Sequence, residues 1–82
     1  MMSDEEIYRL NIAKAVVNMG YVEVSIAKLL GAVDLEDQNS MKLIRDVAAE
    51  ANAHLSRAAD AFDAIKSSVE YKLDRMEKEQ GL

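Results

Sequence analysis

The chain has 82 residues, no cysteine and one histidine, and its 15 acidic against 10 basic residues give a net charge of −5. A domain this small buries only about 60% of its unfolded surface, and the lack of cysteine excludes disulfides and thiolate metal sites, which leaves oligomerisation as the usual means of stabilisation. The acidic balance disfavours nucleic acid as a partner, and one histidine excludes a multi-histidine metal site within one chain.

The composition predicts an all-α protein without a membrane partner. Half of the residues are apolar, with many alanines, no proline and three glycines, and alanine is the strongest helix former. No stretch approaches the ~20 apolar residues that span a bilayer. The acidic N-terminus lacks the basic region of a signal peptide, so we expect a cytoplasmic location.

The first predicted helix covers residues 4–30 and stops at Gly31. Ser3 can cap it, and Glu6 at the third helical position can complete a capping box. Gly20 interrupts the pattern, and the apolar alternation that follows it in residues 22–26 is also compatible with a strand. A strand here would have no second strand to pair with. We therefore predict a continuous helix with a kink near Gly20.

This helix carries two apolar stripes, so we expect other helices to surround it. The first stripe is Tyr8, Ile12, Ala15, Met19, Val22, Ile26 and Leu29, and the second is Leu10, Ala13, Val17, Gly20, Val24, Ala27 and Gly31.

A polar connection of residues 31–40 leads to a second predicted helix at 41–79. Along it, apolar residues repeat with a three-then-four spacing that only Lys72 interrupts, and such a seam requires another helix to cover it. The seam consists of Met41, Ile44, Ala48, Ala51, Leu55, Ala58, Phe62, Ile65, Val69 and Met76. The short connection makes the two helices antiparallel neighbours, with about ten residues of the second helix projecting beyond the first.

We therefore predict one domain, an antiparallel helical hairpin with a long second helix that assembles into an oligomeric bundle or coiled coil. Phe62 and Ile65 should anchor its core, and Phe62→Ala should cost roughly 3–5 kcal/mol if the ring is fully buried. The predicted core and interface residues are Ile12, Met19, Val22, Ile26, Ile44, Ala51, Leu55, Ala58, Phe62, Ile65 and Val69.

Glu23 and His54 are the candidates for buried polar groups. Glu23 lies among apolar positions of the first helix, and a buried carboxylate requires a cationic or hydrogen-bonding partner. His54, Arg45 and Arg57 are within reach of it, from the same chain or from another subunit. A buried pair of this kind would fix the register of an assembly, and the alternative is that Glu23 is exposed at the kink.

Catalysis and cofactor binding are not expected. Asp46, Glu50 and His54 share one helix face, but the Glu-x-x-His pairs of di-metal bundles are missing. Ser56 is two residues from His54 and therefore on another face, so the two cannot act as nucleophile and base. The three isolated glycines form no phosphate-binding loop.

The segment Ser25-Ile-Ala-Lys-Leu-Leu-Gly-Ala32 resembles the second helix of helix-turn-helix DNA-binding domains. In that family a basic and polar recognition helix follows the glycine. Here the acidic run Val33-Asp-Leu-Glu-Asp37 follows, and acids at the groove would oppose phosphate. The resemblance implies a DNA-binding regulator as one alternative function.

The function that we predict is that of a small, non-enzymatic, oligomeric protein–protein interaction module, such as an adaptor, a chaperone-like protein or an inhibitor. Its partners would be further copies of itself and, given the acidic surface, a basic protein. The other alternative is an oligomer that sequesters a small ligand such as a nucleotide, with Tyr8, Tyr21 and Lys28 bordering a pocket between subunits.

Overall fold

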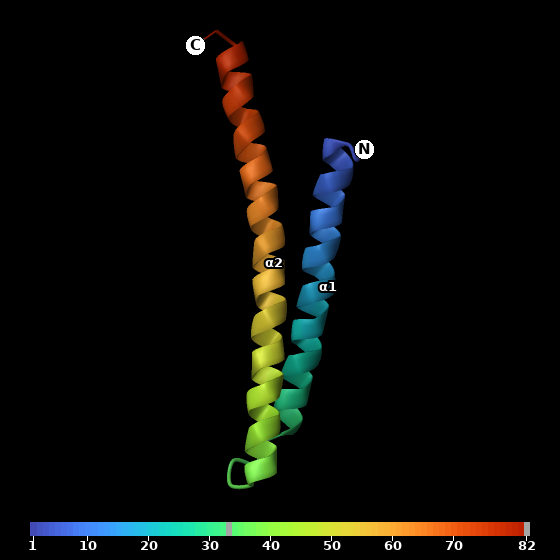
Figure 1. Cartoon of the computed structure of the whole chain (residues 1–82), viewed down its shortest axis with the longest axis vertical. Coiled ribbons are helices and arrows are strands. Elements are labelled where there is room, and N and C mark those ends of the chain that lie inside the picture. Colours follow the sequence, from blue (N-terminus) through green and yellow to red (C-terminus); the bar gives the residue numbers. More distant parts are fainter. Residues whose placement is uncertain (33, 82) are drawn as a thin grey trace.

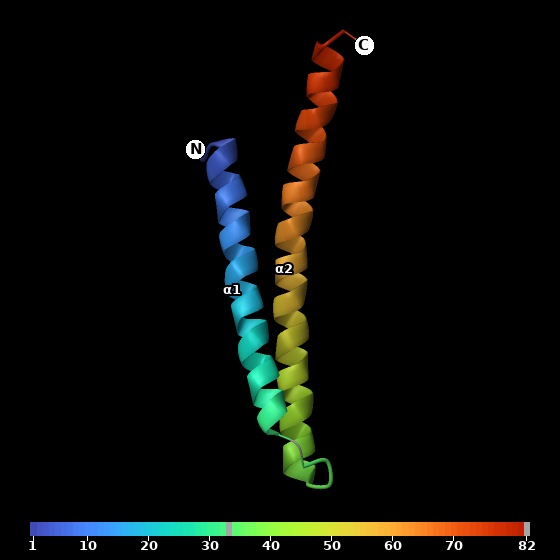
Figure 2. The ribbon, with the colours of Figure 1, turned by 180° about the vertical axis from the view of Figure 1, so that it is seen from behind.

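The computed structural model describes residues 1–32 and 34–81 and contains two helices, α1 (Asp4–Gly31) and α2 (Gln38–Glu79). They lie side by side and antiparallel in a hairpin 66 Å long, and α2 continues well beyond the start of α1 (Figure 1). The reverse view shows the same arrangement, with the helices closest near the connection and further apart at the other end (Figure 2). The predicted all-α hairpin with a longer second helix is confirmed.

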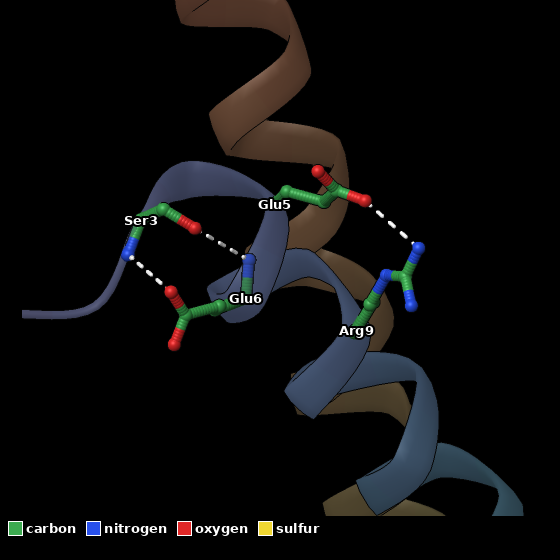
Figure 3. Close-up of polar contacts among 4 residues, drawn as sticks. All are labelled: Ser3, Glu5, Glu6 and Arg9. Carbon is green, nitrogen blue, oxygen red and sulfur yellow. Dashed lines mark hydrogen bonds and ion pairs between the residues drawn. The ribbon is translucent and has the colours of Figure 1, made fainter.

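The start of α1 has the capping box that the sequence predicts (Figure 3). The Glu6 backbone N–H donates to the Ser3 hydroxyl oxygen at 3.1 Å, and the Ser3 N–H donates to the Glu6 carboxylate at 3.5 Å. Arg9 and Glu5 form an exposed ion pair of 2.8 Å one turn further along. The helix then continues through Gly20 to Gly31, so the segment with strand-like alternation is helical.

We expect Ser3→Ala to lower the free energy of unfolding by about 1 kcal/mol, because it leaves backbone N–H groups of the first turn without an acceptor. Urea denaturation followed by circular dichroism measures the change. Ser56→Ala is the matched control, since Ser56 lies exposed in the middle of α2 and should lose nothing. Equal stability of the Ser3 variant and the unaltered protein would contradict the capping role.

Asp37 is the residue that starts α2. Its carboxylate accepts hydrogen bonds from the backbone N–H and the hydroxyl of Ser40, at 2.9 and 3.0 Å. Asp34 accepts from the Glu36 N–H at 3.0 Å, which closes a turn just before it. Because Asp37 caps the helix, α2 begins at Gln38, three residues before the predicted Met41.

The contact between the helices combines small and polar side chains with five branched aliphatic ones. Its buried and half-buried positions follow four-then-three spacing on both helices: Asn11, Ala15, Asn18, Val22, Ser25 and Leu29 on α1, and Ile44, Val47, Ala51, His54, Ala58, Ala61 and Ile65 on α2. Ala58 is 2% exposed and Ala15 3%. Among the described residues no large side chain is fully buried, so the hairpin core is thin.

Most of the bulky apolar side chains predicted for the core lie outside this contact. Phe62 is 56% exposed and Ile26 50%, so Phe62 does not anchor the contact between α1 and α2, and its role in an assembled bundle stays a prediction; Ile65 is half-buried. The reason is a rotation of α2 that turns Val47, His54 and Ala61 toward α1. The other predicted core residues that are exposed are Ile12, Met19, Leu55 and Val69.

Candidate protein-interaction surface

One side of the hairpin is apolar across both helices. An open groove of about 450 Å³ lies there between Phe62 of α2 and the α1 residues Ile12, Val16 and Met19. Helical spacing extends the same side in both directions along each helix. We define the apolar face as Tyr8, Ile12, Val16, Met19 and Ile26 of α1 with Leu55, Phe62 and Val69 of α2, all of them exposed.

The opposite side of the contact carries a polar cluster centred on His54. The Asn18 amide nitrogen donates to the Lys14 carbonyl at 2.8 Å, which turns the Asn18 oxygen toward His54. His54 Nδ1 lies 3.0 Å from that oxygen and donates to it in the tautomer that carries the proton on Nδ1. Tyr21 stacks on the imidazole with centroids 4.7 Å apart, and Arg57 lies 3.3 Å from Nδ1.

His54 thus connects α1 and α2, as a part-buried polar group should. Its ring is satisfied by a hydrogen bond to the other helix and by an aromatic neighbour, which offsets the cost of removing it from water. The sequence places Asn18 roughly opposite the helix face that carries His54, but it did not identify Asn11 and Ser25 as contact residues. Their four-and-three spacing with Ala15 and Val22 was the available signal.

Of the two alternatives for Glu23, a buried and paired carboxylate or an exposed one, the structure shows the exposed one. It is exposed and lines the groove of the apolar face, whereas His54 and Arg57 lie on the polar side. Arg45 pairs instead with Asp46 at 3.0 Å. Within residues 1–32 and 34–81 the Glu23 carboxylate has no ion-pair partner, so the single hairpin leaves a charge at the edge of an apolar groove.

The other candidate site residues are not brought together. Tyr21 lies against His54, while Tyr8 borders a groove of about 430 Å³ near Ile65 and Lys72, closer to the open end of the hairpin. In the part of the chain that the structure describes, no group of three or more His, Asp or Glu side chains could hold a metal ion.

An ion pair joins the two helices at the start of α1. The Lys72 ammonium lies 2.7 Å from the Asp4 carboxylate. Its hydrogen bond, and then its charge, hold the pKa of Asp4 below the usual value of the group. The two side chains are 49% and 72% exposed, so the pair contributes little to stability. It does show which residues of the two helices lie level with each other.

We expect the Asp4–Lys72 pair to add a small acid-sensitive contribution to stability. Because folding lowers the pKa of Asp4, the contribution is present above the unfolded pKa of about 3.9 and disappears as the pH falls through the lower folded value. Lys72→Gln should therefore reduce the fall in melting temperature between about pH 5 and pH 2, and high salt should remove the difference. Lys78→Gln is the control, since Lys78 pairs only within α2. Identical acid profiles for both variants would contradict the prediction.

The segment that resembles a helix-turn-helix domain lies at the end of α1, where Ser25 is buried against α2 and Ile26 is exposed. Val33, which follows it, lies outside the described residues. No protein-family model, curated protein or solved structure matches this chain. None of the helices described is long and apolar enough to cross a membrane.

Proposed function

We propose that this chain is a non-enzymatic protein–protein interaction module that self-associates through helix packing. The observation that carries the proposal is the distribution of side chains between the two surfaces of each helix. Alanine, serine, asparagine and histidine share the contact between α1 and α2 with the buried Val22 and Val47 and a few half-buried aliphatic residues, whereas the aromatic Phe62 and much of the other large apolar surface, such as Met19, lie outside it. Apolar surface gains about 25 cal/mol per Å² when it leaves water, so the outer surface favours association.

The charge of the chain suggests which further partners the module would accept. With a net charge of −5, its surface attracts basic proteins and repels phosphate backbones. An adaptor, a chaperone-like protein and an inhibitor all fit this description. The ligand-sequestering oligomer and the DNA-binding regulator stay predictions from the sequence.

Light scattering coupled to size exclusion, run from low to high micromolar concentration, tests the proposal. We expect a mass that is a multiple of the 9.1 kDa chain and that falls on dilution as the oligomer dissociates. A chain that stays folded at the mass of one copy throughout the range would overturn self-association.

A further inference from the structure

We propose that the apolar face is covered by a second copy of this chain whose loop lies at the opposite end, so that two hairpins form a four-helix bundle. This inference rests on the proposed function and adds the surface, the occupant and the orientation. Three features of the hairpin carry it: its exposed area, the symmetry of the exposed stripes on both helices, and the unpaired charge of Glu23.

One hairpin exposes more surface than a compact monomer of the same mass, and the difference is close to what a dimer interface would cover. The chain exposes 6561 Å², whereas a compact monomeric protein of 9.1 kDa exposes about 4,900 Å². The excess of roughly 1,700 Å² lies within the range of about 1,000–2,500 Å² that each subunit of an obligate dimer buries. The opposite side also exposes Leu10, Val17, Tyr21 and Val24 of α1, but its α2 part is polar, with His54 and Arg57. The apolar face is the side that is apolar on both helices, so it is the side to cover.

The exposed stripe of α2 has the same spacing of apolar residues in both chain directions, so it can pack against an antiparallel copy of itself. It repeats at every seventh position, and its midpoint coincides with the middle of Gln38–Glu79: Met41, Ala48, Leu55, Phe62, Val69 and Met76. When two such helices pack antiparallel about that midpoint, Phe62 of one copy meets Leu55 of the other, and Met76 meets Met41. Ala59, a small residue one turn before Phe62, then lies at the two-fold axis and permits close approach.

The projecting end of α2 selects this orientation over the alternative. The ion pair between Lys72 and Asp4 marks where α1 begins, and beyond it Leu73 and Met76 are 53% and 54% exposed with no α1 beside them (Figure 1). With loops at opposite ends, the start of the second copy's α2 covers this end. With loops at the same end, α1 of each copy would lie over α2 of the other copy, and the projecting ends of both α2 helices would stay in water.

The exposed stripe of α1 is compatible with the same two-fold axis. The contacts of Asn18 with His54 and of Asp4 with Lys72 set the register of the hairpin, which places residues 14–17 of α1 level with the middle of α2. A two-fold axis there brings this part of α1 onto the same part of the second copy. Counting equally in both directions, Glu23 then lies opposite residues 5–11, where Arg9 is the one cation, so the carboxylate gains a cation within reach.

The competing bond of Arg9 does not prevent this pairing. Arg9 binds Glu5 within one copy, but both side chains are at least 70% exposed, and exposed pairs of this kind contribute little to stability. A pair at the edge of a covered apolar face is screened less by salt. Glu23 and Arg9 would therefore set the register of the dimer.

Single cysteines test the orientation directly, because the chain has none of its own. We expect Val16→Cys and Ala59→Cys each to link to themselves with a short bis-maleimide, on the order of tenfold more than Val17→Cys, since sites at a two-fold axis have a millimolar effective concentration. Val17 is the matched control because it is exposed on the side of α1 away from α2. Light scattering on each variant confirms that the oligomer is intact.

Other cross-linking results have distinct meanings. Linking of Val16→Cys to Ala59→Cys in a mixture, with neither linking to itself, would mean loops at the same end and overturn the orientation. An intact oligomer that links through Val17→Cys alone would overturn the choice of face but leave the proposed function standing. A monomer by light scattering would overturn both.

A charge exchange tests the register independently of cysteine chemistry. Glu23→Arg and Arg9→Glu should each raise the dissociation constant of the dimer by on the order of tenfold through like-charge contacts, and the double variant should recover most of the affinity. Two single losses that simply add in the double variant would overturn the pairing of Glu23 with Arg9.

Discussion

Replacing Phe62 with alanine is expected to destabilise the protein by an amount that depends on protein concentration. In one hairpin the ring is 56% exposed, so truncation removes only about 1 kcal/mol of buried contact. In the proposed dimer the ring is covered, and the loss rises toward the roughly 3–5 kcal/mol typical of a buried phenylalanine. Urea unfolding at several concentrations separates these two regimes.

The control for this experiment is Tyr71→Ala. Tyr71 is 65% exposed and lies on α2 away from the apolar face, where its ring contacts Arg75 of the same helix. It should lose little stability at any concentration. If Phe62→Ala and Tyr71→Ala behaved alike at every concentration, Phe62 would not belong to an interface.

The second large effect is expected in the contact between α1 and α2. Ala58 is 2% exposed, and Ala58→Asp would place a carboxylate where only small side chains and no cation fit. An uncompensated buried charge costs about 3–5 kcal/mol, which is most of the stability of a domain of this size. We expect this variant to be largely unfolded at 25 °C by circular dichroism, regardless of concentration.

Ala53→Asp provides the comparison, since it introduces the same residue into the same helix at an exposed position. Its helix propensity cost should be below about 1 kcal/mol, so it should remain folded. A folded Ala58→Asp variant with a stability close to that of Ala53→Asp would show that the helices do not pack through Ala58.

Local features of the helices could be predicted because neighbouring residues determine them. The capping box of Ser3 and Glu6 depends on side chains three positions apart in the sequence. The start of α2 lies three residues before the predicted Met41, because the structure places the cap at Asp37. The overhang followed from the two helix lengths and a short connection.

The choice of contact face could not be read from the spacing of apolar residues. Two different stripes of α2 share one column of residues spaced seven apart, namely Ile44, Ala51, Ala58 and Ile65. Adding Leu55, Phe62 and Val69 to that column gives the more apolar stripe, which the sequence favours. Adding Val47, His54 and Ala61 gives the stripe that faces α1 in the structure.

By itself the sequence determined two helices, the start of the first, their antiparallel order and an excess of apolar surface, since these depend on local hydrogen bonding and on residue type. Only the tertiary structure decided which stripe the helices use for each other. Small side chains and the bond between His54 and Asn18 let the two backbones approach closely, and this places Phe62 and Met19 together on the outside. Apolar periodicity reports which side chains should leave water, but it does not report which neighbour removes them from it.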